Sequence, residues 1–339
     1  MQRPSAQRDK LPAPSSPLDH LSAVLERDMR QVNERILKCM ESDVPLIPQL
    51  ARYLIAAGGK RIRPLLTLAG AAIYGAPMPK TYPLAAAVEF IHTATLLHDD
   101  VVDESAERRG QKAANLIFGN KASVLVGDYL FSKSFQLMVE CDSLEVLAIL
   151  SDAAAVIAQG EVKQLTTSNN IETSLPAYLD VVRSKTAALF AASCQIGPVL
   201  TEADEKQVQA MRDYGMKIGI AFQIVDDMLD YTADSKILGK EIGDDFKEGK
   251  MTAPVIFAVE NADVRERSFW QRTIEEKIIA EGDFEAALEL MERHDALKKS
   301  RILAETYIAE ARQAASVIPE HPLRETLSDL ADFILTRTH

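Results

Sequence analysis

Cysteine is scarce in this sequence of 339 residues, which contains only Cys39, Cys141 and Cys194, far apart and outside any CxxC spacing. An odd number of isolated cysteines argues against a disulfide framework or a zinc site. It favours reduced thiols, which are typical of a cytoplasmic protein. Long apolar runs are lacking as well. The stretches near 64–79 and 186–201 contain Gly and Pro and fall short of the roughly 18–20 uninterrupted apolar residues that a membrane-spanning helix needs.

Basic charge is also in short supply, because 38 Lys and Arg face 50 Asp and Glu, a net charge of -12. A general nucleic-acid binder needs a basic face, so we expect no nucleic-acid partner. Residues 1–17 have several Pro and Ser and no apolar core, which excludes a signal peptide. A transit peptide is conceivable there, but the prolines oppose an amphipathic helix, and we predict a disordered tail over 1–17.

From residue 18 to residue 339 the sequence predicts one helical domain. Apolar residues recur at three- and four-residue spacing over 21–40, and clear runs of alternating β-branched residues are missing. The length would permit two domains, but no long polar linker divides the chain. We therefore predict an all-α fold, a single large helical bundle. Further predicted helices cover residues 46–57, 64–75, 81–104, 121–140, 143–167, 176–200, 204–232, 251–260, 284–293, 299–316 and 322–337.

The stretch LLHDDVVDES, residues 96–105, places three aspartates in a segment that otherwise reads as a buried helix. In a helix, Asp99 and Asp103 lie four residues apart on one face, and Asp100 is rotated by about 100° from Asp99. Like charges at this spacing repel one another, and apolar neighbours add a desolvation cost. One isolated DDxxD motif would fit a solvated stripe or a helix end equally well.

A second copy, FQIVDDMLDY at 222–231, changes that balance, since it repeats the pattern with Asp226, Asp227 and Asp230. Two facing carboxylate clusters repel unless cations lie between them. Mg²⁺ suits such a site, because it prefers oxygen ligands and is usually held by a few carboxylates together with substrate phosphates. Zinc is the weaker choice because His and Cys are scarce. A di-iron site would need two ExxH pairs, and only Glu89 with His92 occurs.

Basic stretches flank both aspartate motifs. Arg side chains can donate two N–H groups to phosphate oxygens, and Lys offers a compact charge. Each cation alone is most often a solvated surface charge, but together they predict a pocket for more than one diphosphate. The cations are Lys60, Arg61 and Arg63 in GGKRIRP, Arg108 and Arg109 in ERRGQK, and Lys240 and Lys250 in GKEIGDDFKEGK.

Four stretches carry a family resemblance: GGKRIRP, EFIHTATLLHDDVVDESAERRG, SKTAALF and FQIVDDMLDYTADSKILGKEIGDDFKEGKMTAPVI. They match, in order, the motifs of the trans-isoprenyl diphosphate synthases, and from about residue 20 onward the chain resembles the long-chain polyprenyl group. One local departure is Ala253, where many members carry Leu. The resemblance implies a helical bundle of the isoprenoid synthase type with a central cavity. It also implies a homodimer that joins isopentenyl diphosphate to an allylic prenyl diphosphate such as farnesyl diphosphate.

The same resemblance implies roles for single residues. The aspartates of both motifs would hold two or three Mg²⁺ ions on the allylic diphosphate, while Arg108 helps to neutralise the leaving group. Lys185 is expected to be catalytic and to bind substrate, Lys250 is expected to bind substrate, and His98 is treated as structural. The positions that grip the allylic diphosphate are Lys185, Thr186, Gln223 and Lys240, and those that bind isopentenyl diphosphate are Lys60, Arg63, His92 and Arg109.

The length of the product is expected to depend on the first aspartate helix, along which the growing chain would extend. Thr95 lies one turn before Asp99 with Ala94 beside it, and Ile91 and Val88 are further turns of about 5.4 Å each. Short-chain members close the tunnel with an aromatic residue in this region, whereas none occupies 94 or 95 here. We predict a product several isoprene units beyond farnesyl. Alternatively, Ala94 and Thr95 are only helix-packing residues. Phe135 and Met138 are candidate floor residues.

The overall sequence looks most similar to bacterial decaprenyl synthases, which make the side chain of ubiquinone, although eight or nine units (octaprenyl or solanesyl) and a geranylgeranyl product remain alternatives. A class I terpene cyclase would share the first DDxxD motif, but it normally carries an Asn/Ser/Glu motif in place of the second. A non-catalytic partner subunit typically loses one motif, and here both are intact. Transient membrane contact during release of the apolar product is a further expectation.

Overall fold

The computed structural model describes residues 16–337, with the exception of residues 57, 77, 109 and 233–241. Within that part the chain is almost entirely helical, and the predicted all-α fold is confirmed. The first half contains α1 (Pro17–Val24), α2 (Glu26–Cys39), α3 (Leu46–Ala56), α4 (Ile62–Tyr74), α5 (Met78–Val102), β1 (Glu107–Arg108), β2 (Gln111–Lys112), α6 (Ala114–Phe118), α7 (Asn120–Glu140) and α8 (Leu144–Thr167). The second half contains α9 (Leu175–Val182), η1 (Arg183–Ala187), α10 (Ala188–Leu200), α11 (Glu205–Thr232), α13 (Asp244–Lys247), α14 (Ala253–Glu260), α15 (Val264–Trp270), η2 (Gln271–Glu275), α16 (Asp283–Arg293), α17 (Ala296–Ala315) and α18 (Pro322–Leu335).

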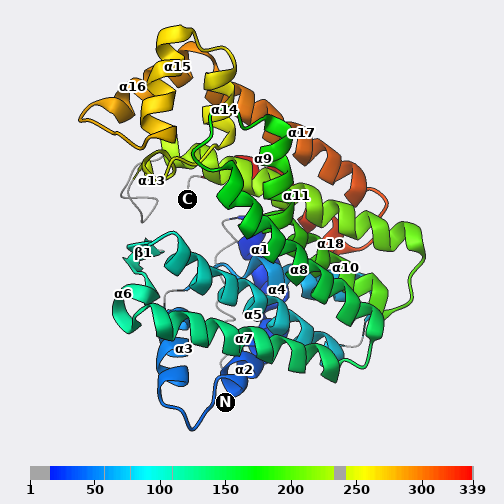
Figure 1. The fold of residues 1–339 in the computed structure, drawn as a ribbon. Helices are drawn as coiled ribbons and strands as arrows, with labels where there is room; N and C mark the ends of the chain where they lie inside the picture. Colours follow the sequence, from blue (N-terminus) through cyan, green and yellow to red (C-terminus); the bar gives the residue numbers. More distant parts are fainter. Residues whose placement is uncertain (1–15, 57, 77, 109, 233–241, 338–339) are drawn as a thin grey trace, which may run out of the picture.

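Two helices, α5 and α10, occupy the middle of the bundle (Figure 1). The first packs against α4 and α7, and the second lies against α4, α8 and α11. Residues 84–88 of α5 are fully buried in succession, and α10 is buried on all sides. A helix that is apolar all round is expected in the centre of a fold. The first aspartate motif thus stands at the end of a central helix.

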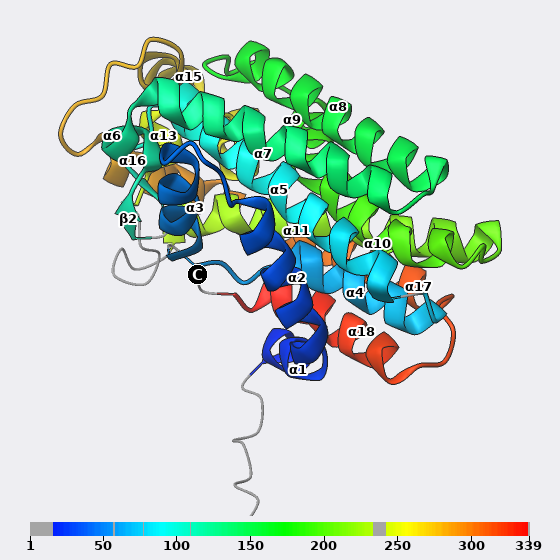
Figure 2. The same ribbon diagram turned by 90° about the horizontal axis from the view of Figure 1, so that it is seen from below.

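The first and last helices of the chain meet on one side of the bundle (Figure 2). Helix α1 packs against α18, and both contact α4. Pro17 is the first residue of α1, capped by the Ser16 side chain, and residues 1–15 of the predicted tail lie outside the described part. Among the described helices, none is both long and apolar enough to cross a membrane. The start of α4, which lies within GGKRIRP, is therefore flanked by residues from both ends of the sequence.

The helical segment from α9 to α10 is continuous but irregular. Helix α9, the π-helical turn η1 and α10 follow one another without a break. Such turns widen the helix locally and are frequent at functional sites. Lys185 and Thr186, two predicted diphosphate-binding residues, lie in this turn.

A buried carboxylate joins α15 to α16 at the far end of the bundle. Glu266 closes a capping box with Asp263 at the start of α15. Its side chain also accepts hydrogen bonds from Arg293 at 2.6 Å and from His294 at 2.8 Å. These hydrogen bonds lower the pKa of Glu266 to about 2. The largest cause is the hydrogen bond from the backbone N–H of Asp263, and the hydrogen bonds from His294 and Arg293 add to it.

We expect Glu266→Gln to lower the free energy of unfolding by about 2 kcal/mol at pH 7, because hydrogen bonds to a charged group contribute about 1.5–3 kcal/mol. The pKa of Glu266 rises from about 2 in the folded protein to near its ordinary value of 4.5 on unfolding. The stabilisation is therefore complete above pH 4.5 and is lost as the pH falls toward 2. Urea unfolding at pH 7 and pH 4 should show a smaller difference between variant and wild type at pH 4.

The matched control is Glu305→Gln, because Glu305 forms an exposed pair with Arg301 at 3.1 Å. Exposed pairs of this kind contribute about 0.5 kcal/mol or less. Equal losses for the two variants would contradict a special role for Glu266.

Candidate active site

The first aspartate motif ends α5 and divides into two kinds of side chain. Asp99 and Asp103 keep 14% and 21% of their side-chain surface exposed, and they lie on the same face as predicted. Asp100 is buried and accepts a hydrogen bond from Arg108 Nε at 2.6 Å. The Asn115 amide also donates to the backbone carbonyl of Asp100 at 2.9 Å. Asp99 and Asp103 are thus the pair that remains accessible, whereas Asp100 fixes the hairpin that carries Arg108.

Lys185 connects this motif to η1 and α8. Its Nζ donates to Glu161 Oε2 at 2.6 Å and lies 3.5 Å from Asp99 Oδ2. Burial by itself lowers the pKa of Lys185, but Asp99 and Glu161 outweigh it, so the pKa is raised above its usual value. Burial raises the pKa of Asp99, and burial together with the charge of Asp99 raises the pKa of Glu161 to about 7. Asp99 and Glu161 share the single ammonium group of Lys185, which neutralises only one of the two negative charges. This pair of acids is therefore suited to binding a further cation.

The second motif lies on α11 and shows the same division. Asp226 keeps 43% of its side chain exposed, whereas Asp227 and Asp230 are buried. Tyr178 donates its hydroxyl to Asp227 at 2.5 Å, and Gln223 donates its amide to the other oxygen at 2.8 Å. Burial is the main cause that raises the pKa of Asp227. In this motif Asp226 is the accessible carboxylate.

Two routes of contact link the motifs across the site. On one side, Thr186 donates to Gln223 at 2.8 Å, and Gln223 in turn holds Asp227 of the second motif. Lys185, the neighbour of Thr186, reaches Asp99 of the first motif, so η1 touches both.

On the other side, the short helix α13 closes the gap between α5 and the end of α11. The backbone N–H of Asp245 donates to Asp230 Oδ2 at 3.0 Å. Lys250 lies 3.6 Å from Asp245 and 3.9 Å from Asp103, and it also pairs with Glu248. Burial opposes the charge of Lys250, but these carboxylates raise its pKa above the usual range. The two aspartate motifs therefore lie on opposite sides of one site, with the side chains of Lys185 and Lys250 beside them.

A second basic region begins at α4. Arg63 Nη1 lies 3.2 Å from His92 Nε2, and its guanidinium group lies 4.3 Å above the ring of Phe190. Gly58, Gly59 and Arg61 all have positive φ angles, which turn the chain sharply before α4. The structure thus brings Arg63 of GGKRIRP together with His92, two turns before Asp99 on α5.

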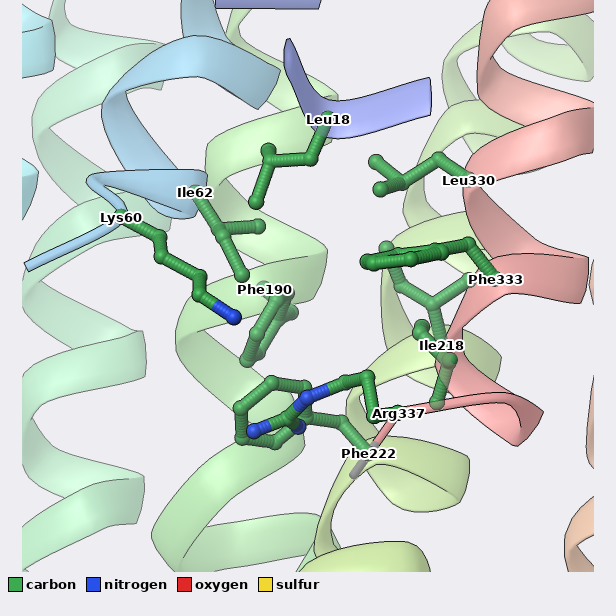
Figure 3. A pocket seen from close by; sticks show the side chains of 10 residues that line it. Leu18, Lys60, Ile62, Phe190, Ile218, Phe222, Leu330, Phe333 and Arg337 are labelled. Atoms are coloured by element: carbon green, nitrogen blue, oxygen red, sulfur yellow. The ribbon is translucent and has the colours of Figure 1, made fainter. Parts of the chain in front are cut away.

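Lys60 and Arg337 point into one narrow pocket beside that region (Figure 3). Arg337 stacks 4.0 Å above the ring of Phe222, and its Nη2 lies 3.9 Å from Asp226 Oδ1. Burial, and then the charge of Arg337, lowers the pKa of Lys60. Two cations in a partly apolar recess form a place where an anion would be stabilised. The remaining walls are Leu18, Ile62, Phe190, Ile218, Leu330, Phe333 and Ile334.

Two predicted ligands, Arg109 and Lys240, lie outside the described residues. Within the described ranges, no group of three acidic, His or Cys side chains forms a ready-made metal cage. The accessible donors of the two motifs are carboxylates, which suit Mg²⁺ because it usually binds one or two carboxylates and completes its shell with substrate phosphates and water. The residues suited to that role are Asp99, Asp103 and Asp226.

The side chains assigned to product length belong to α5 and α7, two helices that pack together. Ala94 and Ile91 are fully buried, and Thr95 is half-buried with its hydroxyl on the carbonyl of His92 at 2.8 Å. Met138 of α7 is fully buried, but Phe135 is 37% exposed, so Phe135 is not a buried floor residue within one protomer.

His98, which was predicted to be structural, contacts α7 rather than the aspartates of the two motifs. Its Nε2 lies 3.3 Å from the carbonyl of Val124 and 3.4 Å from Asp128.

Sequence reasoning missed four residues of the site, which are Glu161, Tyr178, Asp245 and Arg337. Asp245 stood inside the stretch GKEIGDDFKEGK and adjoins Asp244, so its acidic pair was a visible signal. The other three come from α8, α9 and the residues after α18 and carry no repeated motif. Only the tertiary structure brings them to the aspartates.

A family model described as polyprenyl synthetase matches residues 44–291. The chain belongs to the polyprenyl synthetase family. It is therefore a prenyltransferase. Among curated relatives, an octaprenyl diphosphate synthase of Haemophilus influenzae is 41% identical over 322 residues, which cover 95% of this chain and 98% of the relative.

Solved structures agree with this membership. A decaprenyl diphosphate synthase from Rhodobacter capsulatus is 52% identical, with a TM-score of 0.91 over 95% of this chain and 100% of that chain. A polyprenyl synthase from Caulobacter crescentus, solved with calcium and isoprenyl diphosphate, is 48% identical, with a TM-score of 0.92 over 97% of this chain and 100% of that chain. The expected isoprenoid-synthase fold is thereby confirmed.

Proposed function

We propose that this long-chain polyprenyl diphosphate synthase adds isopentenyl diphosphate repeatedly to an allylic diphosphate and ends at a decaprenyl product. The observation that carries the proposal is the pair of facing aspartate motifs, with Asp99 and Asp226 accessible and Lys185 between the two helices. The 52% identity to a decaprenyl synthase favours ten units, and the octaprenyl relatives keep eight units as the alternative. The product would serve as the side chain of a quinone such as ubiquinone.

The reaction begins at the allylic diphosphate. Asp99, Asp103 and Asp226 are the residues that would hold Mg²⁺ beside it, and bound Mg²⁺ would supply positive charge against the negative charge that develops on the diphosphate as its C–O bond breaks. Lys185 and Lys250 add fixed positive charge on the same side. The bonding electrons leave with the diphosphate, and an allylic carbocation remains.

Isopentenyl diphosphate would bind in the basic region formed by Lys60, Arg63, His92 and Arg337, with Arg109 as a further proposed ligand. Its double bond attacks the carbocation, which forms the new C–C bond, and the departing diphosphate takes up the proton that is lost. Phe190 and Phe222 line this recess and would keep water from the cation.

A homodimer is part of this proposal. Helices α6, α7 and α8 pack together and expose large apolar side chains, including Leu125 at 67% and Leu144 at 85%. Apolar surface of this kind is typical of an interface, and a second copy is the usual partner.

Light scattering should find Leu125→Glu monomeric. The control Ile302→Glu, at an exposed position of α17, should stay dimeric. A Leu125→Glu variant that remains dimeric would contradict the assignment of this surface as the interface.

We also propose a cytoplasmic enzyme that touches membranes only while it releases product. The three free cysteines fit a reducing compartment. The product is far more apolar than the protein surface. Flotation with liposomes should therefore increase when decaprenyl diphosphate is present, and no change would count against this contact.

The test of the proposed function is product analysis. Purified protein with Mg²⁺ and labelled farnesyl diphosphate should give a C50 diphosphate only when isopentenyl diphosphate is added. A cyclised hydrocarbon from the allylic substrate alone would support a terpene cyclase instead. Elongation that requires a second, different subunit would support the non-catalytic partner.

A further inference from the structure

Glu161 of α8 is a half-buried carboxylate, 28% exposed, that the proposed reaction does not use. It accepts a hydrogen bond from Lys185 Nζ at 2.6 Å, while Asp99 Oδ2 lies 3.5 Å from the same nitrogen. One ammonium group thus lies between two acids, and it is nearer to Glu161. Because Asp99 is a proposed metal ligand, the position of Lys185 decides how accessible Asp99 is to a cation.

The packing of α8 against η1 builds this contact into the fold. A Cβ atom added at Gly160 would lie 2.7 Å from Cβ of Ser184 and 2.8 Å from the backbone nitrogen of Lys185. Only glycine allows the two backbones to approach so closely. The next residue, Glu161, therefore meets the Lys185 side chain at hydrogen-bond distance.

The two other described cations near the first aspartate motif are already engaged. Arg108 donates to Asp100 at 2.6 Å, on the buried side of α5. Lys250 lies 3.9 Å from Asp103 and pairs with Asp245 and Glu248. Lys185 is therefore the described cation closest to Asp99, and Glu161 is the group that competes with Asp99 for it. An ammonium group bound tightly to Asp99 would compete with a divalent ion for the same oxygens.

We propose that Glu161 is a positioning residue, which holds Lys185 away from Asp99 so that Asp99 remains available to a divalent cation. This inference rests on the proposed function, in which Asp99 binds metal. In the free enzyme Glu161 anchors the ammonium group. When the diphosphate binds, Lys185 is already oriented toward it and Asp99 does not have to exchange partners.

The experiment is a double-mutant cycle on metal binding, measured by calorimetry with Mg²⁺ alone and with Mn²⁺ alone and no substrate. Glu161→Gln should weaken binding about tenfold, because Lys185 then moves onto Asp99. In the Lys185→Gln background the same Glu161→Gln change should have little effect, since no ammonium group remains to compete. If Glu161 acts instead as a metal ligand or as plain negative charge, it weakens binding equally in both backgrounds, and the inference is overturned.

Asp180→Asn is the matched control, because Asp180 forms an exposed pair with Lys163 across the neighbouring α8–α9 contact, at 2.9 Å. It should leave metal binding unchanged. A crystal structure of metal-free Glu161→Gln should show Lys185 moved onto Asp99, and an unmoved Lys185 would also overturn the inference. Wild-type protein that binds no divalent cation without substrate would overturn the inference, whereas protein that binds none even with an allylic diphosphate present would contradict the proposed function itself. Equal losses in both backgrounds contradict only the role of Glu161.

Discussion

Replacement of Asp99 or Asp226 by asparagine is expected to lower kcat/KM for chain elongation by about a hundredfold to a thousandfold. Asp99 is one of the two accessible carboxylates of the first motif, and Asp226 is the accessible one of the second. Asparagine keeps the shape of the side chain but removes the charge. The charge stabilisation that acts at a leaving group is usually the largest single contribution to catalysis, with losses of about 10²–10³ for one group. Initial rates with saturating isopentenyl diphosphate, over a series of Mg²⁺ concentrations, would measure the effect.

The matched control for this prediction is Asp213→Asn on the same helix, α11. Asp213 accepts a hydrogen bond from Gln209 at 2.8 Å and lines a surface pocket formed by α11 and α17, away from both motifs. Its replacement should change the rate by less than about twofold, as is usual for a surface substitution. Elongation that persists at the normal rate in Asp99→Asn or Asp226→Asn would mean that the motifs do not hold the metals.

A second large effect is expected at Ala94, where replacement by tyrosine should shorten the product by several isoprene units. Ala94 is fully buried on α5, five residues before Asp99, or about 7.5 Å along the helix axis. A phenol ring there would block the route that the growing chain follows past Ile91. Reversed-phase chromatography of the dephosphorylated products would report the length.

Since a bulky residue in a packed core costs stability, Thr95→Phe provides a second test at a half-buried position. It should also shorten the product, and melting temperatures would show whether each variant is folded. Ile302→Tyr, at an exposed site on α17, should leave the length unchanged. Folded Ala94 and Thr95 variants that still make the full-length product would exclude this route.

Much of the fold could be predicted because most helices carry an unbroken apolar period. The predicted helices at 121–140 and 143–167 differ from α7 and α8 by a single residue at one end. The stretch 21–40 was predicted as one helix, but it breaks at Leu25 between α1 and α2. Short elements were missed. Helix α15 with η2 has no long apolar stripe, and the β1–β2 hairpin has only two residues in each strand, too few for an alternating pattern.

The aspartate motifs were predicted correctly as a facing pair, but the sequence treats their six carboxylates alike. The structure separates the accessible Asp99, Asp103 and Asp226 from three buried aspartates. That difference depends on donors from distant elements, such as Tyr178 of α9 for Asp227. The local spacing of residues does not predict a contact between distant elements. For the same reason, the sequence did not predict that Glu161 and Arg337 belong to the site.

The most direct test of the central claim is a crystal structure with Mg²⁺ and a non-ionising allylic thiodiphosphate. The account predicts metal ions between α5 and α11, bound both by oxygens of Asp99, Asp103 and Asp226 and by the diphosphate. Lys185 should donate to a phosphate oxygen. A diphosphate bound away from these helices, with the three aspartates turned toward water, would contradict it.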